Sequence, residues 1–109
     1  MKGAIVLIHF PFTDMSGLKL RPALVIHESD QDVIVAFISS RIPKHRSDSD
    51  LLISSDHPSF AGTGLKRPSV IRFDKVATVS RDLIEGGIGD IDEGLARECN
   101  AVMSRVFSV

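Results

Sequence analysis

Runs of consecutive β-branched and aliphatic residues dominate the first part of the chain. Ala4 to His9, Pro22 to His27 and Val33 to Ser39 are such runs, and turn residues separate them. This pattern predicts three β-strands. Because the apolar residues are consecutive and do not alternate with polar ones, we expect both faces of these strands to be buried. A small closed barrel or a subunit interface would provide such burial.

The rest of the chain continues with shorter candidate strands and ends in a helical pattern. The strand candidates are Leu51 to Ser54, Pro68 to Phe73, Lys75 to Ser80 and a ragged edge piece at Leu83 to Ile88. Asp90 followed by Glu93 predicts a capping box at the start of a helix. An apolar stripe follows at spacings of four, three and four residues: Leu95, Cys99, Val102 and Val106. The stripe predicts an amphipathic helix that packs against the strands.

Many short strands followed by one helix predict a mainly β fold. We expect an SH3-like barrel of about six or seven short strands with a C-terminal amphipathic helix, and no βαβ unit. A length of 109 residues suits a single domain, so residues 1–109 are expected to form one. The lone Cys99 cannot form an internal disulfide, and no apolar stretch is long enough to span a membrane. We therefore expect a cytoplasmic protein without a membrane partner.

The charge of the chain is nearly balanced overall but uneven along its length. The net charge is −1, which argues against a protein that coats nucleic acid non-specifically. Residues 1–46 carry six Lys and Arg against four Asp and Glu, whereas the remaining residues carry seven against ten. If the cations of the first part gather on one face, they would form a modest anion-binding surface.

Standard cofactor and metal signatures are absent from the sequence. It contains no Gly-rich phosphate loop, no dinucleotide-binding fingerprint, no Cys-x-x-Cys and no His-Glu-x-x-His, and its four histidines are scattered. No cofactor and no metal site are therefore expected.

The dipeptide Arg21-Pro22 joins the first loop to a strand. Proline restricts the preceding residue to extended backbone, so Arg21 has a defined position at the mouth of the strand. An arginine held in this way can bind a phosphate through two parallel hydrogen bonds and keeps its charge at any working pH. An arginine that only caps a loop through hydrogen bonds would fit the same pattern.

Arg72 and Asp74 are spaced two apart in a strand, which places both side chains on one face and Phe73 on the other. The two can form an ion pair on the surface, or an acid/base pair in a site. If Val70 and Phe73 are both core residues, simple alternation fails, and we expect the strand to twist or bulge here.

Further candidates lie where the third strand ends and in the first loop. Hydroxyls of Ser39 and Ser40 can donate to phosphate oxygens, or can satisfy their own turn. Aromatic residues beside cations can stack on single-stranded RNA, although core packing is the commoner use. The candidate binding residues of these two regions are Phe10, Phe12, Asp14, Lys19, Ser40, Arg41, Lys44, His45 and Arg46.

Four segments together resemble the MazF/PemK family of toxins from type II toxin-antitoxin modules. They are GAIVLIHFPFTDMSGLKLRPALVI, AFISS, GLKRPSVIRFDKVATVS and IGDIDEGLARECNAVM, which occur in the order and at the separations typical of that family. The resemblance implies an SH3-like barrel, a homodimer, and a sequence-specific endoribonuclease that cuts single-stranded mRNA without a metal. It also implies a cognate antitoxin protein that blocks the site, with a DNA operator bound only indirectly, through the antitoxin complex.

The resemblance also implies roles for individual residues. In one branch of the family, the site residues are the Arg of the Arg-Pro dipeptide and a Thr at the end of the third strand, which correspond here to Arg21 and Ser39. In the PemK-like branch an Arg-x-Asp motif supplies acid and base, and Arg72 and Asp74 occupy it. Two departures are evident: serine replaces threonine, and the first loop has no histidine, so that Asp14 would act there only as a hydrogen-bond acceptor.

Two other classes of function remain open at this point. A barrel of this type can act by binding a protein target without catalysis, as gyrase-poisoning toxins of similar fold do. A plain SH3-like interaction module would need an aromatic peptide groove, and the chain has neither Trp nor Tyr to build one.

Overall fold

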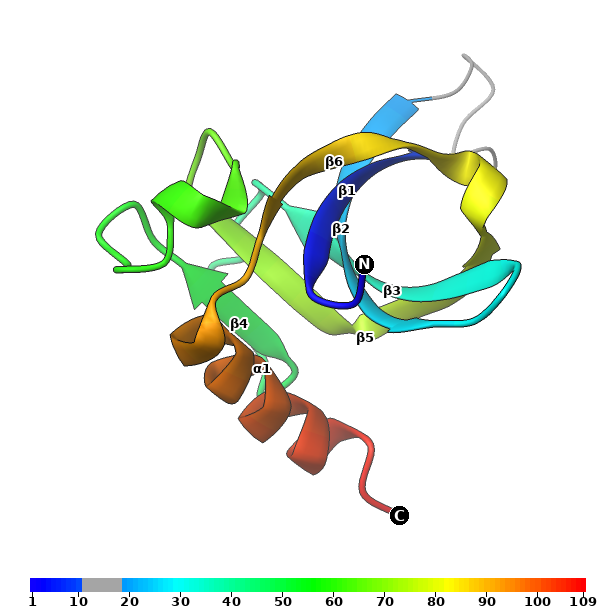
Figure 1. Ribbon diagram of the computed structural model, residues 1–109. Coiled ribbons are helices and arrows are strands. Elements are labelled where there is room, and N and C mark those ends of the chain that lie inside the picture. Colours follow the sequence, from blue (N-terminus) through cyan, green and yellow to red (C-terminus); the bar gives the residue numbers. More distant parts are fainter. Residues whose placement is uncertain (11–18) are drawn as a thin grey trace.

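The computed structural model describes residues 1–10 and 19–109, which form six strands, two short 3₁₀ turns and one α-helix (Figure 1). The elements are β1 (Ala4–Phe10), β2 (Lys19–Glu28), β3 (Asp32–Ser39), β4 (Asp50–Ile53), η1 (Ala61–Thr63), β5 (Ser69–Ser80), η2 (Arg81–Leu83), β6 (Ile84–Asp90) and α1 (Glu93–Val106). The mainly β fold with a C-terminal helix is thus confirmed.

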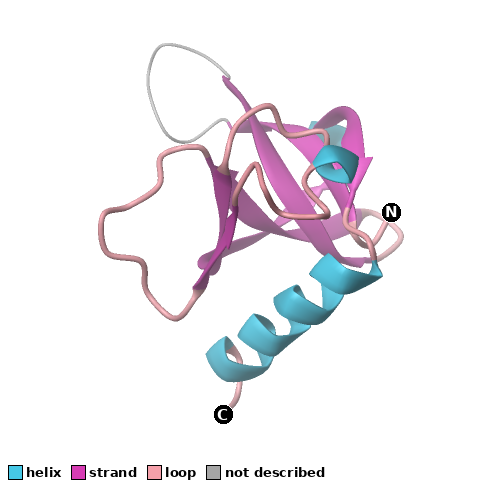
Figure 2. Ribbon diagram, turned by 90° about the vertical axis from the view of Figure 1, so that its left-hand side faces the viewer, coloured by secondary structure: helices cyan, strands magenta, loops and turns pink. Residues whose placement is uncertain are grey.

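All these strands belong to one antiparallel sheet in the order β4-β5-β3-β2-β1-β6. The sheet curls, so that β6, β1, β2, β3 and β5 follow a ring in Figure 1, and η2 connects β5 to β6. α1 lies along the outside of this ring, next to β4 and β5 (Figures 1 and 2).

β5 is one long bent strand, and the prediction of two separate strands in this region was wrong. Ala36 pairs with Val76, whereas the next residue of β3, Phe37, pairs with Arg72. Three residues of β5 therefore bulge out between these two pairs, which is the irregularity expected at this point. The amide of Phe73, the first of the three, donates instead to the carbonyl of Ser49 at 2.9 Å. The bulge bends β5 without ending it.

Two separate hydrophobic clusters cover the two faces of the sheet. One lies inside the curled sheet and includes Val6, Ala23 and Val35. The other lies between the sheet and α1, and the neighbouring residues Ile5 and Leu24 belong to it. Successive residues of β1 and β2 therefore point into different clusters. This arrangement accounts, within a single chain, for the consecutive apolar runs in the sequence.

The helix α1 contributes its predicted stripe to the second cluster. Leu95, Cys99 and Val102 are buried there. The predicted cap, however, was wrong: Asp92 caps the helix, and its Oδ1 accepts from the amide of Leu95 at 2.9 Å. Asp90 instead ends β6, paired with Ala4, so it lies before the helix begins.

Within the described residues, no helix is both long enough and apolar enough to cross a membrane.

Candidate functional site

An open groove of about 490 Å³ lies where β2 begins, β3 ends and β5 bulges. Its lining residues are Arg21, Phe37, Ile38, Ser39, Ser40, Arg41, Arg72 and Lys75. We call it the main groove. Four of these residues are basic and none is acidic, so the groove is suited to an anionic ligand.

A second hollow of about 210 Å³ adjoins the main groove. The two share a wall formed by Arg21, Ile38, Ser39 and Ser40. The second hollow, called the side hollow below, is completed by Leu20, Pro22, Leu65, Lys66, Arg67 and Ser69. Its described lining residues also include no carboxylate, and they add two further cations to the four of the main groove.

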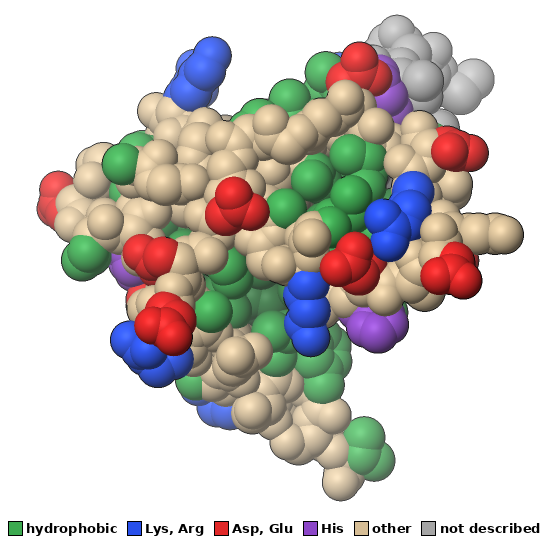
Figure 3. Space-filling view, in the orientation of Figure 1, with side chains coloured by type: hydrophobic (Ala, Val, Ile, Leu, Met, Phe, Trp, Pro, Cys, Tyr) green, Lys and Arg blue, Asp and Glu red, His purple; other side chains and the backbone are tan. Residues whose placement is uncertain are grey.

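The face of the molecule in Figure 3 differs from this region, because acidic and basic side chains are interspersed across it. The chain as a whole carries a net charge of −1. The sequence left open whether the cations of residues 1–46 gather on one face. Of the six basic residues around the shared wall, only Arg21 and Arg41 come from that part of the chain.

Arg21 belongs to the shared wall and is exposed on β2. The ladder between β2 and β3 pairs Ala23 with Phe37, and the same register continued by two residues places Arg21 opposite Ser39. Within the described part of the chain, the Arg21 side chain makes no hydrogen bond or ion pair. Its guanidinium is therefore free to bind an anion from either hollow.

Ser39, at the end of β3, has its hydroxyl oriented by the backbone that follows. Its Oγ accepts a hydrogen bond from the amide of Arg41 at 3.1 Å. The oxygen is thereby held in place, while the hydroxyl proton remains available to a ligand in the groove. Ser39 can therefore accept a hydrogen bond within its own turn and donate one to an anion at the same time.

Arg72 contacts two carboxylates. Its Nε lies 2.8 Å from Oδ1 of Asp50 and 3.4 Å from Oδ1 of Asp74. The Asp50 contact is an ion pair without hydrogen-bond alignment, since neither atom has a hydrogen-bond partner among the described residues although both are buried. The Asp74 carboxylate is 43% exposed, whereas that of Asp50 is 3% exposed. The charge of Arg72 is thus largely compensated, unlike that of Arg21.

The remaining predicted binding residues are distributed differently. Ser40 and Arg41 line the main groove. Lys44, His45 and Arg46 are exposed on the loop between β3 and β4, and Lys19 is exposed at the start of β2; none of the four lines either hollow. Phe10 is the last residue of β1, and Phe12 and Asp14 lie outside the described residues.

Four residues of this region were missed by the sequence reasoning: Asp50, Lys66, Arg67 and Lys75. A signal for two of them was present, because Lys66-Arg67-Pro68 repeats the arginine-proline pairing of Arg21-Pro22 ahead of another strand residue. Asp50 gave no such signal, since its partner is 22 positions away in the chain and is reached only through the pairing of β4 with β5.

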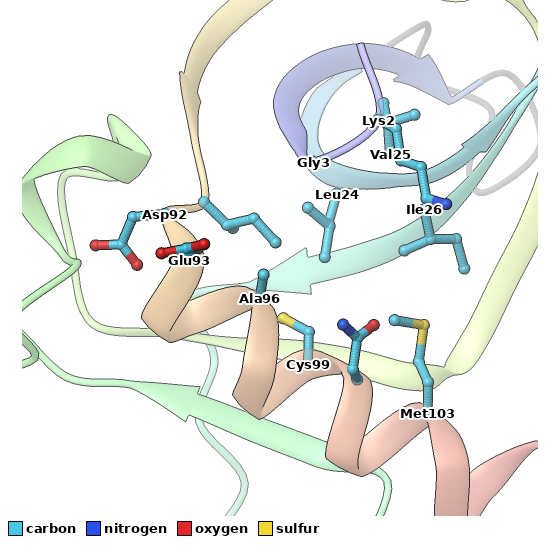
Figure 4. A pocket seen from close by; sticks show the side chains of 12 residues that line it. Lys2, Gly3, Leu24, Val25, Ile26, Asp92, Glu93, Ala96, Cys99 and Met103 are labelled. Atoms are coloured by element: carbon cyan, nitrogen blue, oxygen red, sulfur yellow. The ribbon is translucent and has the colours of Figure 1, made fainter.

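A third hollow, of about 310 Å³, lies between β2 and α1 (Figure 4). Leu24 and Ile26 of β2 point into it from one side, and Cys99 and Met103 of α1 from the other. Burial, together with the nearby Glu98 carboxylate, raises the pKa of the Cys99 thiol to about 12. The thiol is thus protonated near neutral pH and is unsuited to act as a nucleophile.

The described residues contain no group of three or more His, Cys, Asp or Glu side chains placed to hold a metal ion. The chemistry that the main groove can support from its own residues is the binding and stabilisation of negative charge by guanidinium, ammonium and hydroxyl donors.

Nearly the whole chain matches one known family. A family model described as the PemK-like, MazF-like toxin of type II toxin-antitoxin systems covers residues 1–107. A search of curated protein sequences found no match.

Several solved structures share the fold of this chain. The Mycobacterium tuberculosis toxin MazF-mt6 superposes with a TM-score of 0.74 at 18% identity, over 95% of both chains. An endoribonuclease in complex with its cognate antitoxin, from a mycobacterial species, has a TM-score of 0.71 at 10% identity and covers 96% of this chain and 91% of its own. An Mtb toxin has a TM-score of 0.67 at 19% identity, and the match covers 93% of this chain and 99% of the toxin chain. At these identities the likeness concerns the fold.

Proposed function

Because the chain belongs to the PemK-like, MazF-like toxin family of type II toxin-antitoxin systems, we propose that it is an endoribonuclease that cleaves single-stranded mRNA in the main groove. The observation that carries the proposal is the shared wall, where the unpaired Arg21 and the oriented hydroxyl of Ser39 lie among further cations, with no carboxylate among the described lining residues. Such a surface matches the charge of an RNA backbone.

The proposed reaction is in-line attack of a 2′-hydroxyl on the adjacent phosphorus. The bond from the 2′ oxygen to phosphorus forms as the bond from phosphorus to the 5′ oxygen breaks, which leaves a cyclic phosphate and a free 5′-hydroxyl. A base must take the 2′ proton, and an acid must protonate the leaving oxygen. The additional negative charge on the pentavalent phosphorus must be stabilised by donors that are already in place.

We assign the principal stabilising charge to Arg21 and a hydrogen bond to a non-bridging oxygen to Ser39. Arg72 and Asp74 are assigned to orienting the phosphate or assisting proton transfer. Asp74 lines neither hollow, but it is the more exposed of the two carboxylates that contact Arg72, which does line the main groove, so Asp74 would act through Arg72 or on a ligand that extends beyond the groove. Asp50, whose side chain is 3% exposed, is assigned to positioning Arg72.

The first test is RNA cleavage by the purified protein in the presence of a chelator. We expect single-stranded RNA to be cut at defined sequences in EDTA, with cyclic phosphate and 5′-hydroxyl ends. Dependence on an added divalent metal would contradict the metal-independent chemistry. Intact RNA in both conditions would instead support a non-catalytic toxin that binds a protein target.

Arg21→Lys is the sharper test of the assignment. Lysine keeps the positive charge but cannot form two parallel hydrogen bonds to one phosphate, so we expect the cleavage rate to fall ~10²-fold or more. Arg97→Lys is a matched control, because Arg97 is exposed on α1 and does not line the groove. A near-native rate for Arg21→Lys would remove Arg21 from the role proposed for it.

We further propose that the toxin is a homodimer in the cytoplasm and that a cognate antitoxin protein blocks the groove. The neighbour described as an endoribonuclease in complex with its cognate antitoxin supports the second part by analogy of fold. A DNA operator would be reached only through such an antitoxin complex.

A further inference from the structure

The side hollow has features of a binding site that the proposed reaction does not use. It meets the main groove at Arg21 and Ser39, where the proposed reaction places the scissile phosphate. Lys66 and Arg67 line the side hollow but not the main groove, and none of the described lining residues of the side hollow is a carboxylate. A ligand bound at the shared wall can therefore extend along basic surface into the main groove or into the side hollow.

The backbone holds Lys66 and Arg67 firmly from the C-terminal side. Pro68 restricts Arg67 to extended backbone, as Pro22 restricts Arg21. The hydroxyl of Ser69, which is only 3% exposed, donates to the carbonyl of Arg67 at 2.9 Å. Both arginines of the side hollow thus project from backbone that is fixed before any ligand binds.

The N-terminal side of the same segment is equally constrained. The hydroxyl of the fully buried Thr63 donates to the carbonyl of Phe60 at 2.6 Å and accepts from the amide of Leu65 at 3.1 Å. Gly64 has a φ of +75°, and a Cβ at this position would lie 2.0 Å from the carbonyl oxygen of Ile88. The turn before Lys66 is therefore packed directly onto β6.

The side chains of Lys66 and Arg67 are exposed and make no ion pair or hydrogen bond within the residues that the structure describes. Apolar side chains, Leu20 and Leu65, line the same hollow beside them. Leu20 is 44% exposed, which leaves apolar surface available for a ligand to cover. Two uncompensated cations beside an apolar surface suit a nucleotide, whose phosphate is charged and whose base has an apolar face.

We infer that the side hollow is a subsite for one nucleotide next to the cleavage point, with Lys66 and Arg67 holding the phosphate adjacent to the scissile one. The inference rests on the proposed function. It makes the substrate a strand that is gripped on both sides of Arg21, by Arg41 and Lys75 in the main groove and by Lys66 and Arg67 in the side hollow.

The test compares Lys66→Ala/Arg67→Ala with Lys2→Ala/Arg97→Ala, a control that removes the same two charges from exposed positions outside both hollows. For the first variant we expect KM to rise about tenfold or more, because a charge-assisted hydrogen bond to the substrate is removed, with kcat nearly unchanged. The slope of log Kd against log salt, measured by fluorescence anisotropy with an uncleavable 2′-O-methyl oligonucleotide, should fall by about 0.7 for each phosphate that the variant no longer neutralises. The control variant should match the wild type.

Shortening the RNA locates the subsite. Removal of the nucleotides on one side of the cleavage point should abolish the difference between the wild type and Lys66→Ala/Arg67→Ala, and removal on the other side should preserve it. Lys66→Arg/Arg67→Lys, which keeps both charges, should restore the salt slope.

The outcomes separate the two proposals. If the wild type cleaves RNA and both double variants share its KM and salt slope, the subsite is wrong while the proposed function stands. If the wild type neither cleaves nor binds single-stranded RNA, the proposed function itself fails. Equal thermal midpoints for the two double variants exclude misfolding as the cause of any difference.

Discussion

At the scale of single residues, the carboxylates around Arg72 have distinct roles. Asp50 and Asp74 contact the same Nε atom, but the first carboxylate is 3% exposed and the second 43%. Solvent screens an exposed pair, whereas a buried pair that loses one partner leaves an uncompensated charge. Removal of these two carboxylates therefore affects different properties of the protein.

Asp50→Ala should destabilise the fold by about 2 kcal/mol, because it leaves the guanidinium of Arg72 without its buried partner. Asp74→Ala is the matched control and should change the free energy of unfolding by ~0 to 1 kcal/mol, while slowing RNA cleavage. Urea denaturation measures the first effect and an RNA cleavage assay the second. If Asp74→Ala lowered the free energy of unfolding more than Asp50→Ala did, Asp50 would not be the partner that positions Arg72.

The arginine at the mouth of β2 was identified from sequence, since a pre-proline arginine is a local pattern. Its counterpart Arg67 has the same local pattern and was passed over, because nothing in the sequence indicates that the two face the same hollow. Asp50 could not have been found in this way, since only the pairing of β4 with β5 brings it to Arg72. Local patterns therefore identify candidates, and sheet pairing selects among them.

At the scale of elements, the start of α1 depends on Asp92 and its neighbours. Its carboxylate accepts from the amide of Leu95 and from the hydroxyl of Ser59, at 2.9 and 2.7 Å. These hydrogen bonds hold the pKa of Asp92 below its ordinary value of 3.8, and the one from the Leu95 amide has the larger effect. The lowered pKa means that the folded state favours the ionised form.

Asp92→Ala should therefore lower the thermal midpoint at pH 7, whereas Asp90→Ala, at the position where the sequence suggested a cap, should leave it nearly unchanged. A carboxylate whose pKa is lowered by folding stabilises the folded state at pH values above its pKa in the unfolded chain. This contribution is lost as the pH falls through its pKa in the folded state. The gap between the wild type and Asp92→Ala should thus narrow below pH 3.8. A gap that is constant with pH would show that the charge of Asp92 is not involved.

Two predictions were wrong for the same reason: the helix cap at Asp90, and the division of β5 into two strands. Asp90 with Glu93 fits the local capping pattern, but Asp90 is needed as the last residue of β6. Similarly, Asp74 interrupts the apolar pattern of β5, yet pairing with β3 resumes beyond the bulge. In both places the pairing of strands overrides a local preference.

At the scale of the whole molecule, burial of both sheet faces does not require a second subunit. The two hydrophobic clusters account for it within one chain. The dimer therefore rests on the family relationship and stays a proposal.

We expect sedimentation equilibrium to give a mass about twice 11.9 kDa at micromolar concentration. The proposed homodimer would contain two copies of the shared wall, one from each subunit. A monomer at that concentration would restrict the RNA site to the residues of a single chain.

The bulged strand β5 has a consequence for how the molecule opens. It pairs with β3 along its length and with β4 over its first residues, and it supplies Phe73 to one hydrophobic cluster and Val79 to the other. No local fluctuation can release β5 without disrupting both clusters. Its paired amides should therefore exchange hydrogen for deuterium only as fast as global unfolding permits, whereas amides of β6, an edge strand, should exchange through smaller openings.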